Sequence, residues 1–261
     1  RVGPEHPTKQ QDQLRDGLAA RRGLAINEPM DVPPFRDPAR PLDERVRDLV
    51  GRLTLDEKVS QMMHTAKAVP RLGIPAYNYW NEALHGVARN GRATVFPQII
   101  GLAASWDEKL VRRVASAIAD EARAKHHEAL GRAGETAQYQ GLTFWSPNIN
   151  IYRDPRWGRG EETWGEDPEL TSVLALAFVR GLQGNDARHL KTAACAKHFA
   201  VHSGPEADRH TFDAAVSTHD LWDTYLPAFE RLVHGAKVES VMGAYNRLQG
   251  EARALPPPQL L

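Results

Sequence analysis

The segment DPRWGRGEETWGED, residues 154–167, gathers side chains that could recognise a ligand. It holds two arginines, two tryptophans and five acids and has neither helical nor strand periodicity. Indole faces stack on sugar rings, and a planar guanidinium donates hydrogen bonds to neighbouring hydroxyls. The segment therefore predicts polyol binding. The alternative is a structural loop in which Arg156 and Arg159 pair with nearby glutamates while the tryptophans cover the core.

A second group with chemical potential is Lys197 and His198, which stand together in an otherwise apolar run. Burying such a pair is costly without partners, so they form either a satisfied buried pair or part of a binding site. Four further histidines could suggest a metal: His126, His127, His202 and His210. Their spacing matches no H-E-x-x-H or paired-ligand pattern, so we expect no metal and no other cofactor.

The composition bounds the class of protein. With 261 residues, 41% hydrophobic and 25% charged, the chain can build one sizeable core. Lys+Arg and Asp+Glu number 33 each, so the chain has no net charge that would attract nucleic acid or an anionic membrane. No stretch reaches the roughly 18 apolar residues of a membrane span. The lone cysteine, Cys195, has apolar neighbours and is predicted to be a buried small side chain rather than a nucleophile.

Four helices are expected to position these residues. Thr54 and Glu57 form a capping box before a run through Met62 and Met63. The same signal at Ser105 and Glu108 predicts a helix to about residue 130. Asp167 before Pro168 predicts a helix to Gly181, and Thr218 begins one that ends at Gly235.

Short apolar runs between these helices predict buried strands at 77–80, 142–151, 193–201 and 240–245. Strand and helix alternate, which indicates βαβ units and a parallel sheet, in a barrel or a doubly wound fold. No glycine-rich nucleotide motif follows a strand, which favours the barrel. In a parallel barrel function collects where strands end. Polar residues do follow these runs: Asn81, Glu82, His85, Asn148, Asn150, Arg153, Lys197, His198, His202, Tyr245 and Asn246.

Before this alternation, residues 1–41 are rich in charge, Gln and Pro, with one short helical candidate near residues 10–22. We interpret them as an N-terminal arm, and residues 42–261 as one domain.

Five ordered motifs resemble the N-terminal domain of glycoside hydrolase family 3, and within it the β-xylosidase branch. They are WNEALHGVA from Trp80, ATVFPQIIGLAASWD, RDPRWGRGEETWGED, KHFAVHSGPEADRHTFD and SVMGAYNRLQGE. The resemblance implies an α/β fold of the (β/α)₈ TIM-barrel type, whose strand ends bind the terminal sugar of a β-linked oligosaccharide.

The resemblance also implies roles for single residues. Glu82 takes the early acidic position that accepts hydrogen bonds from sugar hydroxyls, where many glucosidases of the family carry Asp. Arg159 grips ring hydroxyls, with Glu162 placed to orient it. Lys197 and His198 match the family's K-H pair. Three further positions complete the candidate site: Tyr245 beside the expected nucleophile, His210 as a structural or substrate-contacting residue, and Trp80 near Glu82.

One departure from the family pattern concerns the chemistry. The family's nucleophile is an aspartate in an S-D-[WC]-like motif after the Y-N-x-x-x-G-E segment, which here is residues 245–251, so we expect it beyond Leu261. The general acid usually lies in a second domain. Only four clear strands are predicted, so we expect a C-terminally incomplete barrel that requires a completing chain or missing C-terminal domains. The chain alone is expected to be inactive and only marginally stable.

The expected function is exo-acting, retaining hydrolysis of β-xylosides, in which this chain holds the sugar-binding part. One alternative is a β-glucosidase or an N-acetylglucosaminidase-like member, for which the Asp208 and His210 pair would supply the acid. The other is a non-catalytic carbohydrate-binding fragment. Family resemblance favours a periplasmic or extracellular location.

Overall fold

The computed structural model describes residues 32–252, so the helix expected near residues 10–22 lies outside the described residues. The chain divides into two compact units between Lys58 and Val59. In the first unit, a 3₁₀ turn η2 (Pro34–Arg36) precedes helices α2 (Leu42–Arg52) and α3 (Leu55–Ser60). The backbone N–H of Phe35 donates to the Asp48 carboxylate at 3.1 Å, which ties η2 to α2.

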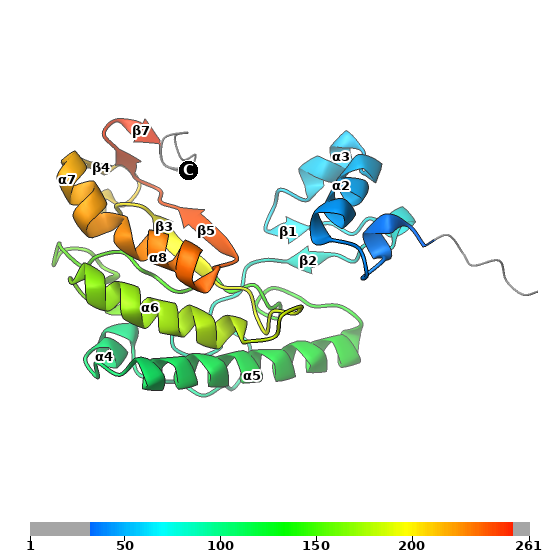
Figure 1. The fold of residues 1–261 in the computed structure, drawn as a ribbon, viewed down its shortest axis with the longest axis horizontal. Helices are drawn as coiled ribbons and strands as arrows, with labels where there is room; N and C mark the ends of the chain where they lie inside the picture. The colour runs from blue at the N-terminus through cyan, green and yellow to red at the C-terminus, as the bar shows by residue number, and fades with distance from the viewer. Residues whose placement is uncertain (1–31, 253–261) are drawn as a thin grey trace, which may run out of the picture. The chain divides into compact units, whose positions relative to one another are not determined.

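The second unit alternates short strands with helices (Figure 1). Its elements run in the order β1 (Thr65–Ala66), η3 (Pro70–Leu72), β2 (Tyr77–Asn78), α4 (Ile99–Ala103), α5 (Glu108–Ala133), η4 (Gly160–Glu162), α6 (Pro168–Gln183), β3 (Cys195–Phe199), η5 (Glu206–Asp208), β4 (Asp213–Ala214), α7 (Thr218–Asp220), η6 (Leu221–Tyr225), α8 (Pro227–Ala236), β5 (Ser240–Gly243), β6 (Arg247–Leu248) and β7 (Glu251–Ala252). Of its strand pairs, β3–β5 and β4–β6 are parallel, whereas β1–β2 and β6–β7 are antiparallel.

Four segments lie side by side in the order of the sequence. Asn81 pairs with Phe144, Thr143 with Ala193, and β3 with β5, all in parallel. The predicted strand at 142–151 is present only as isolated bridges, partly because Pro147 has no N–H to donate to a ladder. This order does not reverse, as it would in a doubly wound sheet, and it fits the predicted barrel type. The sheet is not closed within residues 59–252.

The core lies between these segments and the helices. Helices α5, α6 and α8 pack side by side (Figure 1). Val111, Ile118 and Ala122 recur on one face of α5 and are buried, as are Leu174 and Phe178 of α6. Such apolar stripes account for the helix positions, because each stripe is removed from water only against a neighbouring element.

Three helix predictions need correction. The capping box is confirmed, since Thr54 N and Glu57 Oε2 lie 2.8 Å apart, but α3 ends at Ser60 before Met62. The cap of α5 is Asp107 rather than Ser105: its carboxylate accepts from two backbone N–H groups at 2.9 Å. The helix predicted from Thr218 is divided into α7, the π-helix η6 and α8.

The predicted helix after Asp167 is confirmed. Asp167 Oδ1 accepts from Leu170 N at 2.6 Å, and Pro168 occupies the first turn of α6, where no N–H is needed. None of the helices between residues 32 and 252 is both long and apolar enough to span a membrane.

Candidate functional site

The candidate site is built where the central strands end. Asn148 pairs with Lys197 across two neighbouring segments, and the sequence then turns into loops that carry the remaining polar residues. The ladder between β3 and β5 is irregular between Lys197 and Phe199, and the peptide bond between Lys197 and His198 is cis. His198 lies beside the loop of residues 154–167, since its Nε2 is 3.1 Å from Arg159 Nη1.

Arg159 forms the centre of the site. Its Nε and Nη2 donate to the two carboxylate oxygens of Glu162 at 3.0 and 2.5 Å, a bidentate geometry that fixes the guanidinium plane. Its Nη1 lies 3.1 Å from His198 Nε2. Both side chains of the ion pair are less than 20% exposed, so the pair is screened much less by solvent than a surface pair.

Glu162 remains ionised in this setting. Burial acts to raise its pKa, but the hydrogen bond from Arg159 and the positive charges of Arg159 and Lys197 together lower the pKa below its ordinary value. A hydrogen bond from Asn148 Nδ2 at 3.4 Å acts in the same direction. The glutamate therefore holds the Arg159 guanidinium as a carboxylate.

His198 is fixed by Asn150. Asn150 Nδ2 donates to the carbonyl oxygens of His198 and Ala200 at 2.8 and 3.1 Å. Its Oδ1 therefore accepts from His198 N at 2.8 Å and from His198 Nδ1 at 3.0 Å. This assignment leaves Nε2 as the acceptor facing Arg159. Burial, with the charges of Lys197 and Arg159, lowers the pKa of His198 well below its usual value, so the imidazole is neutral.

Lys197 is 6% exposed, and its ammonium forms no hydrogen bond or ion pair with another residue of the range 32–252, although Nζ is not among the fully buried atoms that lack a partner. Burial is the main cause that lowers its pKa to about 8, and Arg159 adds to it. The charges of Glu162 and Glu82 act to raise the pKa of Lys197, but they only partly offset the lowering by burial and by Arg159. The site thus holds a buried amine whose three N–H donors are available to a ligand.

Glu82 is held by two neighbours that come from its own segment. Trp80 Nε1 donates to its Oε1 at 3.0 Å, and Arg89 Nε lies 3.4 Å from its Oε2. Trp80 also stacks on Trp145, with ring centroids 5.1 Å apart. The carboxylate is about one third exposed, so it faces both solvent and the electrostatic field of Lys197.

An aromatic row extends the site away from Arg159. The ring of His198 lies 4.7 Å from that of His202, which lies 6.1 Å from Tyr245, which lies 5.0 Å from His210. Tyr245 is 63% exposed and His210 is exposed, whereas both His198 and His202 are buried. The structure therefore brings all eight candidate residues of the sequence analysis into one continuous set of contacts and charges.

The tryptophans of the 154–167 segment differ from the first expectation. Trp157 and Trp164 are 4% and 0% exposed, so their faces are covered by protein and cannot stack on a sugar. Trp164 packs edge-on against Phe178, with centroids 5.7 Å apart. Arg156 pairs with Asp154 at 2.8 Å on the surface rather than with a glutamate. In this loop the tryptophans are structural, and only Arg159 and Glu162 join the site.

No hydrogen bond joins Asp208 to His210 in the described part of the chain. The Asp208 carbonyl oxygen instead accepts from Phe212 N at 2.7 Å and Thr211 N at 2.9 Å, which shapes the turn. The arrangement expected of an acid supplied by this pair is therefore not formed here.

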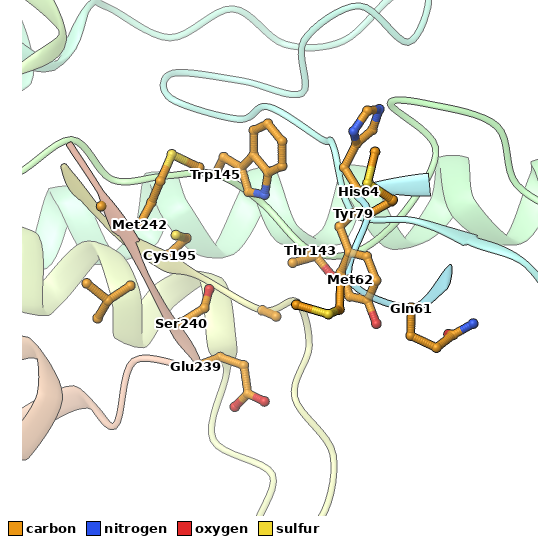
Figure 2. Close-up of a pocket in the computed structure, with 14 residues that line it drawn as sticks. Gln61, Met62, His64, Tyr79, Thr143, Trp145, Cys195, Glu239, Ser240 and Met242 are labelled. Atoms are coloured by element: carbon orange, nitrogen blue, oxygen red, sulfur yellow. The ribbon is translucent and has the colours of Figure 1, made fainter. Parts of the chain in front are cut away.

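A pocket of about 640 Å³ lies on the strands of the site (Figure 2). Cys195, Ser240 and Met242 lie together in it, and Trp145 and Met62 also line it. Because side chains alternate along a strand, Cys195 and Lys197 lie on the same face of β3. Burial raises the pKa of Cys195 and keeps it a thiol, which confirms a buried small side chain. Residues 32–252 contain no cluster of three or more His, Cys, Asp or Glu suited to a metal.

The sequence named some supporting residues without giving them roles, and it missed others. Asn148 and Asn150 were recognised as polar residues after a strand, but not as the groups that hold Glu162 and His198. Arg89 and Trp145 were not recognised at all. No spacing signal could have identified them, since Arg89 has φ 58° in a turn and Trp145 meets Trp80 only in the folded sheet.

Comparison with known proteins identifies the family of this chain. Residues 48–261 match the glycosyl hydrolase family 3 N terminal domain. The chain is 50% identical over 221 residues to the xylan 1,4-beta-xylosidase of Xylanibacter ruminicola, covering 84% of this chain and 26% of that protein.

Solved structures give the same result. A GH3 exo-beta-xylosidase, XlnD, in complex with a xylobiose aziridine probe superposes with a TM-score of 0.76 at 35% identity, covering 87% of this chain and 30% of that one. A β-glucosidase, EmGH1 from Erythrobacter marinus, superposes with a TM-score of 0.69 at 28% identity, covering 84% and 34%. The chain thus spans only about a quarter to a third of these relatives.

Proposed function

Because this chain belongs to glycosyl hydrolase family 3, through its N terminal domain, we propose that it forms the terminal-sugar site of an exo-acting, retaining β-xylosidase. Its similarity to proteins named as β-xylosidases supports the choice within the family. The substrate class is a β-linked oligosaccharide with xylose at the end that enters the site. No nucleic acid or membrane partner is proposed.

The observation that best supports sugar binding is the buried set of hydrogen-bond donors around Arg159. A guanidinium has five N–H donors, and three of them are used for Glu162 and His198. The others, together with the Lys197 ammonium, can donate to adjacent ring hydroxyls, while Glu82 can accept from them. Donors and acceptors fixed at low exposure suit a polyol, because they need little reorganisation when it binds.

Preference for xylose over glucose would come from Glu82 and Trp80. Xylose lacks the C6 hydroxymethyl group of glucose, and a glutamate held by the Trp80 indole at 3.0 Å can occupy that space. In the complete polypeptide that contains this chain, shortening the side chain with Glu82→Asp should raise the ratio of glucoside to xyloside hydrolysis. An unchanged ratio would exclude Glu82 as the residue that selects the sugar.

We further propose that this chain binds the sugar but does not hydrolyse it. Retaining hydrolysis needs two carboxyl groups about 5 to 5.5 Å apart, one as nucleophile and one as acid. The two carboxylates of the described site are both engaged, Glu162 by Arg159 and Asn148, and Glu82 by Trp80 and Arg89. A nucleophilic aspartate and an acid from another segment or chain would complete the chemistry.

Two measurements test these proposals. Xylose titration of this chain, followed by tryptophan fluorescence or calorimetry, should show saturable binding that Arg159→Lys weakens and Arg188→Lys does not. A flat titration would exclude sugar binding by the chain. The complete polypeptide that contains this chain should hydrolyse aryl β-xyloside faster than the glucoside, arabinoside and N-acetylglucosaminide. A dominant glucosidase activity would overturn the sugar assignment while leaving the family and the site intact.

A further inference from the structure

A small, partly enclosed cavity lies beside the candidate site, between the loop that carries Arg159 and the chain that follows β3. It encloses about 10 Å³ and is lined by Trp157, His202, Gly204, Pro205, Arg209 and Phe212. This volume is close to the minimum that holds one water molecule.

Three of the lining residues each present a buried polar atom with no hydrogen-bond partner from the described protein. These atoms are Trp157 Nε1, His202 Nε2 and Arg209 Nε. Only five fully buried side-chain nitrogen or oxygen atoms between residues 32 and 252 lack a partner, and three of them belong to residues that line this one cavity. A buried polar group without a partner is costly, which makes this coincidence informative.

The direction of each hydrogen bond at the cavity can be assigned. Asn246 Nδ2 donates to the carbonyl oxygens of Val201 and Arg247 at 2.7 and 2.8 Å, so its Oδ1 is the acceptor for His202 Nδ1 at 2.8 Å. His202 Nδ1 therefore carries the hydrogen, and Nε2 is an acceptor. Burial lowers the pKa of His202, which keeps the ring neutral. The cavity thus offers two N–H donors and one nitrogen acceptor.

The charge at the cavity favours a neutral occupant. Arg209 Nη2 is paired with Glu206 Oε1 at 2.5 Å, so the guanidinium charge is already compensated. An anion would find only the neutral indole and imidazole beside this pair, and a cation would face two N–H donors. A water molecule can accept two hydrogen bonds and donate one to a third partner, as this set of atoms requires.

We propose that this cavity is a specific site for one water molecule, which accepts from Trp157 Nε1 and Arg209 Nε and donates to His202 Nε2. The water joins two segments that are already linked on the protein side: Glu206 N donates to the Arg156 carbonyl at 3.1 Å, and Glu206 Oε2 accepts from Gly158 N at 3.2 Å. It thereby holds the loop of Arg159 against the segment of His202.

Crystallography of the chain at a resolution that shows ordered water tests the site directly. We expect a single density peak within hydrogen-bond distance of all three atoms. In Trp157→Phe the peak should weaken or move, whereas Trp164→Phe should leave it unchanged. Trp164 is the matched control because its Nε1 is also buried and unpartnered but does not line this cavity.

A solution measurement decides the question if Trp157→Phe does not fold. In the unsubstituted chain, water-selected NOE spectra should show magnetisation transfer from a long-lived water to the indole N–H of Trp157 and none to that of Trp164. A cavity without density at the three atoms, or one filled by a protein side chain, would overturn the proposal. Equal transfer to both indoles would also count against it, since exchange with bulk water would then explain the signal.

Discussion

At the scale of single residues, Lys197 is held in the protein at a cost to stability. Its pKa falls from 10.5 to about 8, so the unfolded state binds more protons than the folded state between those two values. The free energy of unfolding therefore rises with pH between about 8 and 10.5. Below pH 8 the folded state bears the full cost of burying the charged ammonium. A depression of this size corresponds to about 3 kcal/mol, which a ligand that bonds the ammonium would recover in part.

We expect Lys197→Met to stabilise the chain and to abolish sugar binding. Urea unfolding at pH 7 should show a gain of about 1 to 3 kcal/mol, because the buried charge is removed at similar volume, and the gain should shrink at pH 10. The matched control is Lys191→Met, which should destabilise, since Lys191 Nζ is bonded to Ser116 and lies 2.7 Å from Asp120. A stability loss of equal size for both variants would contradict the assignment of a buried, unpaired charge.

Asn150 is predicted to position His198. Asn150→Ala leaves two buried N–H groups, the backbone N–H and the ring Nδ1–H of His198, and two buried carbonyl oxygens without their partner, which should cost about 2 to 3 kcal/mol. It should also release the histidine tautomer, so the ring nitrogen NMR shifts of His198 should move from a single protonated Nδ1 toward a mixture. Asn185→Ala, which removes an exposed contact to Arg112, should change stability by less than about 0.5 kcal/mol. Unmoved His198 shifts would reduce Asn150 to a purely structural residue.

The types of the site residues could be predicted from the sequence, but their partners could not. Polar residues after apolar runs indicated Lys197, His198, Asn148 and Asn150, because strand ends in a parallel barrel converge. Which atom of Asn150 faces which carbonyl depends on the irregular backbone after Lys197, and no periodicity encodes it. The buried tryptophans show the same limit, since an indole in a charged loop has no pattern that distinguishes a core side chain from a binding face.

At the scale of elements, the helix starts were predictable where the capping chemistry is local. Asp167 with Pro168 fixes the start of α6 within one turn of chain. Ser105 failed as a cap because its hydroxyl donates to the Leu102 carbonyl at 2.6 Å and so belongs to the end of α4. The π-helix η6 between α7 and α8 was missed, because the apolar spacing there is compatible with one continuous helix.

The closeness of α5 and α6 yields a prediction at this scale. A Cβ at Gly181 of α6 would lie 2.5 Å from the Arg112 carbonyl oxygen and 2.6 Å from the Ala115 Cβ of α5. Gly181→Ala should therefore destabilise by about 1 to 3 kcal/mol, because overpacking outweighs the better helix propensity of alanine. Gly131→Ala in α5, where nothing lies within 4 Å, should stabilise by about 0.5 to 1 kcal/mol. Chemical denaturation gives the free energy of unfolding of both variants. If that free energy rose in each, α5 and α6 would be able to move apart without cost.

At the scale of the whole molecule, the resemblance to the family predicted more than periodicity did. Apolar runs indicated four strands. The structure shows β3 and β5 as a parallel pair and connects the two earlier segments to them by isolated parallel bridges. The ladder of the predicted strand at 77–80 is instead antiparallel, with β1. The closure of a barrel is a non-local property, and residues 59–252 do not display it. Two apolar side chains that line the pocket of Figure 2 are exposed: Val241 on β5 at 46% and Met62 at 84%.

The free edge of β5 favours self-association of this chain. Within the described residues β5 is paired only with β3, so one row of its backbone donors and acceptors can pair with another chain. We expect this chain, purified alone, to self-associate with rising concentration. A charged side chain disfavours edge pairing, so Val241→Lys should shift the chain toward monomer in sedimentation velocity or light scattering. Val233→Lys on α8 replaces a valine of similar exposure, 42%, and should leave association unchanged. If both variants reduced association equally, added charge alone would be responsible, and a monomeric unsubstituted chain at all concentrations would show that this edge is protected.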